Sequence, residues 1–412
     1  MVESTCANGH DLICFSHLRW DFVYQRPQHL LSRCAKHRRV FILEEPMIQG
    51  DTPELSMSQR ECGVWVVVPQ LPQGLSEQAA IALQRQLLDD LIASEQVQSP
   101  VLWYYTPMAV PFSYHLKAAA TVYDCMDELS AFKGAHPELQ AREAHLFQLA
   151  DLVFTGGRSL YEAKQHQHAS VHAFPSSIDV AHFIQARQPV AEPDDQAPIP
   201  HPRLGFYGVV DERMDLELLD GIAQAQPDWH LVVIGPVVKI DPATLPHRPN
   251  IHYLGGKSYQ DLPQYLAGWD VALLPFARNE STRFISPTKT PEYLAASKPV
   301  VSTSIRDVVR PYGQAELVHI ADTVPEFVTA IAAALQQPQT QPHWLPQVDA
   351  FLSQMSWDLT WSAMNELIEA AILMNQRTTG RIQTRPTIAS VKSVSPKPQK
   401  AVAIANDSTL AS

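Results

Sequence analysis

The sequence has few cysteines and no motif that would pair them. Its five cysteines, Cys6, Cys14, Cys34, Cys62 and Cys125, are odd in number and form no C-x-x-C pair. Free thiols in a reducing compartment are therefore expected. Three nearby histidines, His166, His168 and His172, lack the four-ligand pattern of a zinc site. No acidic DxD motif is present either, so no bound metal is expected.

Long apolar runs are also missing. None approaches the roughly 20 residues of a membrane span, and the N-terminal MVESTCANGHD lacks the basic and apolar regions of a signal peptide. A cytoplasmic location is therefore predicted. The formal net charge of −12, from 31 basic and 43 acidic side chains, argues against an exposed nucleic-acid surface.

The C-terminal end carries a net positive charge. The stretch 376–412 holds six Lys or Arg residues and one Asp, a net charge of +5, and is rich in Ser, Thr, Pro and Lys. This composition predicts a disordered tail. A solvated tail is the simpler interpretation, and peripheral contact with anionic lipid at the inner face of the membrane is the alternative.

Length and patterning indicate two α/β domains. At 412 residues the chain is too long for one ordinary core, and in each half short apolar runs alternate with helical segments, as in doubly wound parallel sheets. Residues 188–202, QPVAEPDDQAPIPHP, contain five prolines and are predicted to be a linker. The predicted parts are a first domain (1–187), this linker, a second domain (203–346), a helix that returns to the first domain (347–375), and the tail.

In the first half, polar residues follow two apolar strands. The strand at 11–16 runs into a loop, and ligands of parallel sheets bind beyond the carboxyl ends of strands. The loop is crowded with His17, Arg19, Trp20, Asp21, Gln25 and Arg26; a surface loop around a buried Trp is the alternative. The strand at 119–125 runs into Asp124, Asp127 and Glu128, which could serve acid–base chemistry or could cap the next helix.

The second half centres on Asn279–Thr303, a polar loop followed by a short helix and an apolar strand. Thr290 is predicted to cap the helix with Pro291 at its first position. A start at Ser286 would place Pro291 inside the helix, where proline breaks the hydrogen-bond ladder. The free N–H groups, the hydroxyls and one cation make this loop a candidate diphosphate site, with Ser286, Thr288, Lys289 and Thr290 as its ligands. An ordinary capped connection is the alternative.

This segment resembles the donor-sugar loop of retaining glycosyltransferases of the GT-B fold, family 4 type. The resemblance lies in the order of its parts: an acidic loop, a helix with a glutamate, Ala-Ala-Ser-Lys, and Pro-Val-Val-Ser-Thr. WDFVYQRPQHL and SWDLTW are similar to segments of the same family, above all of the subgroup that includes teichuronic acid glycosyltransferases. The resemblance covers about 11–374. It implies two Rossmann-like domains facing a cleft, with the acceptor on the first domain and a nucleotide-diphosphate sugar, rather than a cofactor, on the second. It also implies that the loop after the first strand forms the acceptor side or contacts donor phosphates, with the candidate residues His17, Arg19, Trp20, Asp21, Gln25 and Arg26.

The family resemblance also implies roles for individual residues. The family has two glutamates separated by seven residues, of which the first touches the sugar and the second the ribose. Glu292 fits the second, whereas Phe284 stands at the first place, so Glu280 is a candidate substitute. Asp127 would bind a sugar hydroxyl or stabilise an oxocarbenium-like centre. The predicted catalytic residues are Asp127, Lys289 and Glu292; the predicted donor ligands are Arg213, Gly235, Gly256, Tyr259, Glu280, Ser286, Thr288 and Thr290.

The predicted function is thus metal-independent hexosyl transfer with retention, in polysaccharide biosynthesis of the cell envelope, onto a glycan, lipid-linked or small-molecule acceptor. Two alternatives stay open. A non-catalytic GT-B binding or assembly protein would explain the missing first glutamate. A nucleotide-sugar epimerase would need a group that takes a proton from the sugar.

Overall fold

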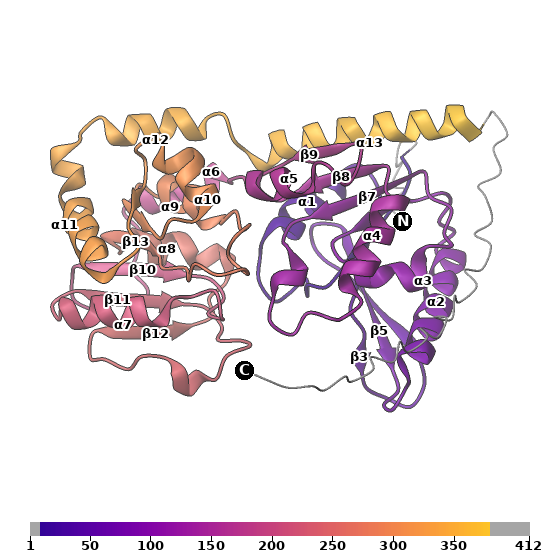
Figure 1. Cartoon of the computed structure of the whole chain (residues 1–412), viewed down its shortest axis with the longest axis horizontal. Helices are drawn as coiled ribbons and strands as arrows, with labels where there is room; N and C mark the ends of the chain where they lie inside the picture. The colour runs from indigo at the N-terminus through magenta and orange to yellow at the C-terminus, as the bar shows by residue number, and fades with distance from the viewer. Residues whose placement is uncertain (1–8, 380–412) are drawn as a thin grey trace, which may run out of the picture.

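The computed structural model describes residues 9–379, which form two parallel α/β domains side by side (Figure 1). The first contains a nine-stranded sheet and the second a six-stranded sheet. The strands of the first sheet are β1 (Leu12–Ser16), β2 (Val40–Glu44), β3 (Met47–Ile48), β4 (Glu54–Gln59), β5 (Val64–Leu71), β6 (Val101–Tyr104), β7 (Ala120–Cys125), β8 (Leu152–Thr155) and β9 (Val171–Ala173). Those of the second are β10 (Arg203–Tyr207), β11 (His230–Ile234), β12 (Ile251–Gly255), β13 (Val271–Leu274), β14 (Val300–Ser302) and β15 (His319–Ile320).

The first sheet has the order β3-β5-β2-β1-β6-β7-β8-β9, and β4 pairs antiparallel with β5. Because side chains alternate along a strand, Leu12 and Cys14 of β1 enter one core while Ile13 and Phe15 enter the other. The sheet is therefore buried on both faces. Its helices are α1 (Arg26–Cys34), α2 (Glu77–Ser94), α3 (Val110–Ser113), α4 (Leu139–Leu149) and α5 (Arg158–Lys164), with short turns η1 (Pro107–Ala109) and η2 (Leu129–Ala131).

The second sheet is wholly parallel, in the order β12-β11-β10-β13-β14-β15. One continuous apolar core surrounds it. Its helices are α7 (Leu216–Ala225), α8 (Leu262–Ala267), α9 (Lys289–Ala295), α10 (Arg306–Val308), α11 (Val324–Thr340) and α12 (Trp344–Leu352), with short segments η4 (Pro242–Thr244), η5 (Tyr259–Asp261) and η6 (Val309–Gly313).

The chain crosses between the domains twice. The first crossing contains α6 (Val180–Phe183) and η3 (Ile184–Arg187). Its apolar residues Ile178, Phe183 and Ala186 pack into the second core, so the first domain ends earlier than the predicted 187. Residues 188–202 form no helix or strand.

The second crossing leads into α13 (Trp357–Thr379), which lies along the first domain (Figure 1). Trp357, Trp361 and Met364 are buried in the core beneath it. The return to the first domain was predicted, but 347–375 is not one helix: α12 ends at Leu352, and α13 extends to Thr379. The remainder of the predicted tail, 380–412, lies outside the described residues.

Contacts between the domains fix their relative placement. The Asp307 carboxylate of the second domain accepts a hydrogen bond from the backbone N–H of Ser159, at 3.0 Å, in the first. Arg310 forms an ion pair with Glu162 beside it, at 3.3 Å. At the crossings, the N–H of Trp357 donates to the carbonyl of Ile178 at 3.2 Å.

Candidate active site

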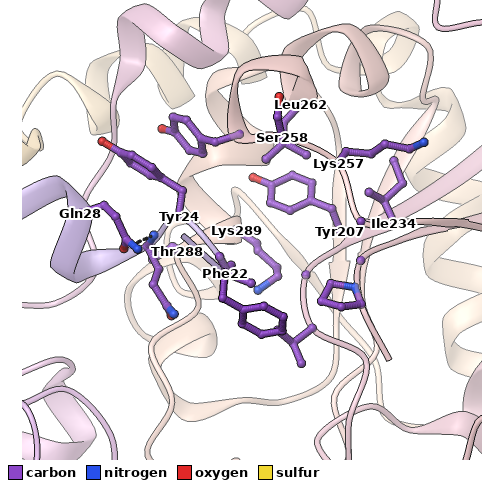
Figure 2. Close-up of a pocket in the computed structure, with 18 of the residues that line it drawn as sticks. Phe22, Tyr24, Gln28, Tyr207, Ile234, Lys257, Ser258, Leu262, Thr288 and Lys289 are labelled. Atoms are coloured by element: carbon purple, nitrogen blue, oxygen red, sulfur yellow. Dashed lines mark hydrogen bonds between the residues drawn. The ribbon is translucent and has the colours of Figure 1, made fainter. Parts of the chain in front are cut away.

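Both domains line a cavity of about 640 Å³ (Figure 2), a volume typical of small-molecule sites. It lies at the carboxyl ends of β10, β11 and β12 and beneath the loop that follows β1, where parallel sheets bind ligands. The first domain contributes Trp20, Asp21, Phe22, Val23, Tyr24, Gln25 and Gln28. The second contributes Tyr207, Gly208, Val209, Arg213, Ile234, Gly235, Pro236, Gly256, Lys257, Ser258, Tyr259, Gln260, Leu262, Thr288, Lys289 and Glu292.

The loop before α9 does deliver Lys289 to this cavity, but the helix starts earlier than predicted. Thr288 is the residue before the helix, and the N–H of Thr290 donates to the carbonyl of Pro287 at 3.2 Å. Pro291 is therefore the third helical residue. The first four N–H groups of a helix have no partner within it, so proline there breaks no hydrogen bond. The predicted cap at Thr290 is wrong: its side chain is buried and its hydroxyl has no hydrogen-bond partner among the described residues.

Glu292 and Lys289 both line the cavity from α9. Glu292 is only 5% exposed, and burial raises the pKa of its carboxyl to about 7, against the opposing effects of Tyr207 and Lys289. The Tyr207 hydroxyl donates a hydrogen bond to this carboxylate. Burial, together with the charge of Arg213, lowers the pKa of the Lys289 amine to about 8. Near neutral pH the site therefore holds an ammonium beside an acid that titrates.

Two glycines keep the cavity wall free of side chains. Gly208 and Gly235 have φ of +136° and +144°, values that favour glycine. A Cβ on Gly235 would lie 1.8 Å from the Gly208 carbonyl oxygen, and one on Gly208 would lie 2.2 Å from Cε of Lys289. The two glycines therefore allow close packing at this wall, where Gly208, Gly235 and Lys289 all line the cavity.

A smaller cavity of about 100 Å³ joins the donor-side residues to the first domain. Asp127 lines it together with Arg213 and Lys289. Burial raises the pKa of the Asp127 carboxyl to about 6, which Arg213 and Arg26 partly offset. Arg213 is held by Asp211, at 2.7 Å. Ser286 and Thr288 also line this cavity, and the Ser286 carbonyl accepts a hydrogen bond from Ser176 at 2.6 Å.

The three acids at the carboxyl end of β7 have different roles. Asp124 is fully buried and pairs with Arg26, whose guanidinium Nη2 lies 2.9 Å away. Glu128 pairs with Lys164 at 2.8 Å. Asp127 alone faces a cavity, so the first domain offers one carboxylate rather than an acid–base pair.

Most polar residues predicted for the acceptor side are engaged within the protein. Arg19 forms an ion pair with Glu44 at 3.0 Å, and Asp21 pairs with Arg60. Arg26 is neutralised by Asp124, as above, although it lines the smaller cavity together with Gln25. Trp20 is buried at the wall of the larger cavity. These contacts position the loop itself.

His17 does not line either cavity. Burial lowers the pKa of its imidazole to about 4, with a further effect of Lys239, so it is neutral near pH 7. The structure therefore gives His17 no contact with the cleft that a bound acceptor would use.

Three further predictions concern the donor side. Gly256 and Tyr259 line the larger cavity, and the Tyr259 ring stacks on Tyr24 of the first domain, with centroids 4.3 Å apart. Glu280 lines neither cavity; its side chain is 76% exposed and pairs with Arg283. Phe284, at the place of the family's first glutamate, packs against the core of the first domain. The structure therefore shows no substitute for that glutamate in this loop.

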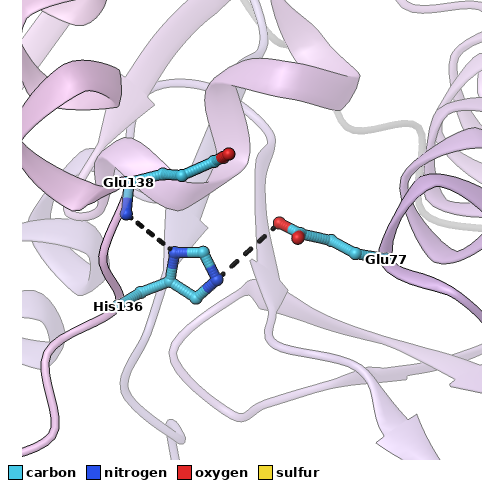
Figure 3. Close-up of side chains that lie close together, drawn as sticks. All are labelled: Glu77, His136 and Glu138. Atoms are coloured by element: carbon cyan, nitrogen blue, oxygen red, sulfur yellow. Dashed lines mark hydrogen bonds and ion pairs between the residues drawn. The ribbon is translucent and has the colours of Figure 1, made fainter.

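One cluster has the composition of a metal site (Figure 3). Glu77, His136 and Glu138 bring one ligand atom each within 4.8 Å of the others, on the surface of the first domain. The Arg142 guanidinium, however, bonds both carboxylates. A cation already occupies the position that a metal ion would need, so these residues do not fit a metal centre.

Sequence reasoning missed several residues of the cavity, above all Phe22, Tyr24, Gln28, Tyr207 and Gly208. Tyr207 is the last residue of an apolar strand, so nothing in its pattern sets it apart from core residues. The position of Gly208 directly after that strand was the one available signal.

Residues 202–337 match the family described as glycosyl transferases group 1. TuaH of Bacillus subtilis strain 168, whose name assigns it to teichuronic acid biosynthesis as a glycosyltransferase, is 25% identical over 240 residues. That match covers 53% of this chain and 59% of TuaH, so it spans less than two thirds of the relative's length.

Solved structures resemble the whole architecture. The trehalose-6-phosphate synthase of E. coli, bound with UDP-2-fluoroglucose, has a TM-score of 0.65 at 11% identity, covering 87% of this chain and 98% of its own. Sucrose-phosphate synthase of Thermosynechococcus elongatus has a TM-score of 0.64 at 13% identity, covering 89% and 100%. Anabaena HepE in complex with UDP and glucose gives 0.61 at 13%, covering 87% and 99%. At these identities the likeness concerns the fold, and it confirms the predicted GT-B architecture.

Proposed function

We propose that this protein transfers a sugar from a nucleotide-diphosphate sugar with retention of configuration. The match of residues 202–337 to the group 1 glycosyltransferases and the GT-B fold of the two domains support this proposal. The observation that carries this proposal is the cavity between the domains, where Lys289 and Arg213 approach a wall of bare glycine backbone.

The two cations suit a diphosphate leaving group. Cleavage of the sugar–phosphate bond leaves negative charge on the diphosphate, and preorganised cations in a partly dry site stabilise such developing charge. Gly208 and Gly235 line the same cavity, and glycine backbone there would allow phosphate oxygens to approach closely. Because Lys289 and Arg213 supply this charge, we propose that the reaction needs no metal.

Glu292 is the proposed ribose ligand. As a carboxylate it accepts hydrogen bonds from ribose hydroxyls, and the Tyr207 hydroxyl fixes its orientation. Asp127, at the smaller cavity across from Lys289, would bind a sugar hydroxyl or stabilise positive charge at the reacting carbon. Its pKa of about 6 leaves it mostly ionised at neutral pH.

The proposed acceptor is a glycan, lipid-linked or small molecule that enters from the first domain. The name of TuaH supports an envelope polysaccharide as the pathway. Between residues 9 and 379, no helix combines the length and apolarity that crossing a bilayer requires.

Calorimetry with UDP, GDP and ADP tests the proposal. The wild type is expected to bind one diphosphate selectively, and a Lys289→Ala, Glu292→Ala double variant should lose that binding. A Lys117→Ala, Glu54→Ala double variant makes the same change in charge at exposed positions outside the cavities and is the control. Failure of the wild type to bind any of the three would refute the proposed mechanism. Binding without donor consumption, even with cell extract as acceptor, would instead favour the non-catalytic alternative.

A further inference from the structure

We infer that Phe22, on the loop of the first domain after β1, forms the second wall of the donor site and packs against the ribose and diphosphate of the bound nucleotide. This inference rests on the proposed function. It adds a contact from the acceptor domain to the donor, through a residue type with no charge and no hydrogen-bonding group.

The first observation is the exposure of the ring. Phe22 is 54% exposed although it lines the cavity. Within the described residues no other aromatic ring packs on it, in contrast to Tyr24 and Tyr259, which stack on each other. A large apolar ring that is left open in a concave site gains by covering a ligand.

The second observation is that the loop is anchored on both sides of the ring. The N–H of Trp20 donates to Glu44 at 2.7 Å, and the Gln28 amide donates to the Trp20 carbonyl at 2.6 Å. On the other side, Tyr24 is held by its stacking on Tyr259 across the domain boundary. The N–H of Phe22 itself donates to the Arg19 carbonyl at 3.3 Å. The ring is thus presented by a preorganised segment, so little ordering entropy is lost when a ligand binds.

The third observation is what the ring faces. In the view of Figure 2 the Phe22 ring is drawn on the same side of the cavity as Lys289 and opposite Ser258 and Leu262, and all four residues line the cavity. A diphosphate held by Lys289 and the bare backbone of Gly208 would therefore have Phe22 as its cover. The part of a nucleotide that reaches this end is the ribose–diphosphate portion, which all nucleotides share.

Two consequences follow. Removing the ring should weaken by the same factor every nucleotide that the wild type binds measurably, because the base is not what the ring contacts. The ring also excludes water from the diphosphate, which strengthens the electrostatic effect of Lys289, so turnover should fall along with affinity.

The test compares Phe22→Ala with Phe22→Trp, which restores an aromatic surface, by calorimetry with each nucleotide. Tyr114→Ala is the matched control, since Tyr114 is a 46% exposed aromatic residue of the same domain that does not line the cavity. Phe22→Ala should bind about tenfold more weakly, Phe22→Trp should recover most of the affinity, and Tyr114→Ala should bind like the wild type. Thermal unfolding of Phe22→Ala should be unchanged, because the ring is not part of a core.

The outcomes separate the two proposals. Wild-type affinity in Phe22→Ala, while Lys289→Ala loses binding, would overturn the role of Phe22 and leave the proposed function intact. Unequal losses among the nucleotides that the wild type binds measurably would also overturn it, because the ring would then contact the base. No binding by the wild type would overturn the proposed function and this inference with it.

Discussion

Replacement of Glu292 by glutamine should stabilise the protein at alkaline pH while it removes a proposed donor ligand. Burial raises the pKa of this carboxyl from 4.5 to about 7. When the pKa of an acid is higher in the folded state than in the unfolded state, its protonation stabilises the folded state. This contribution to the free energy of unfolding is complete below the unfolded pKa and is lost as pH rises through the folded pKa. At about 1.4 kcal/mol per pH unit, the ionised carboxylate therefore lowers the free energy of unfolding by about 3 kcal/mol at pH 8.

The Glu292→Gln variant keeps the shape of the side chain, and its amide oxygen can still accept the hydrogen bond from Tyr207. Urea unfolding at pH 5 and pH 8 measures the effect. The variant should gain stability over the wild type by about 3 kcal/mol at pH 8, and by well under half of that at pH 5. The comparison of variant with wild type cancels other titrating groups, including Asp127, whose pKa is about 6.

Equal differences in stability at the two pH values would show that Glu292 is not protonated near neutrality in the folded state. A variant less stable than the wild type at pH 8 would show that the carboxylate is stabilised by contacts stronger than its desolvation. Either result would refute the reasoning from burial. A gain in stability with a loss of nucleotide binding would identify Glu292 as an acid kept in a buried position for function.

Two further outcomes are expected. Because burial lowers the pKa of the Lys289 amine to about 8, the affinity of the protein for the nucleotide should fall above pH 8. Calorimetry between pH 7 and 9.5 measures this fall, and Lys289→Arg, which keeps its charge, should remove it. If the fall persists in Lys289→Arg, another group causes it. Gly235→Ala should destabilise the protein by about 2–4 kcal/mol in urea unfolding and abolish nucleotide binding, because its Cβ would strike the Gly208 carbonyl. Gly256→Ala is the control, since its Cβ would meet no atom within 4 Å. Equal stability of the two variants would contradict the clash.

Local pattern was sufficient for the buried parallel strands at the centre of each sheet. Runs such as LICFS and HLVVI are apolar without alternation because parallel sheets are covered on both faces. The loop before α9 was identified from its hydroxyls, its lysine and its order relative to the next strand. The start of α9 was misplaced, since proline is tolerated at any of the first positions of a helix and composition alone cannot choose among them.

Side-chain partners could not be predicted in the same way. Asp124, Asp127 and Glu128 look equivalent in the sequence, yet Asp124 pairs with Arg26, 98 positions away, and Glu128 with Lys164. Asp127, which forms no such ion pair among the described residues, is the acid that lines the smaller cavity. Glu280 was a candidate because of its place in the loop, but its side chain points to solvent and pairs with Arg283.

The sequence by itself determined the two parallel sheets, the return of the last helix and the loop and helix that carry Lys289 and Glu292, because apolar periodicity and short motifs act over neighbouring residues. Only the tertiary structure decided that Asp127 and not Asp124 lines the cleft, that Tyr207 bonds Glu292, and that Phe22 lines the same cavity as Lys289. Each of these three features depends on which distant segments meet at the carboxyl ends of the strands. Burial and ion pairing at that place determine the charge of each side chain and whether it lines the cavity.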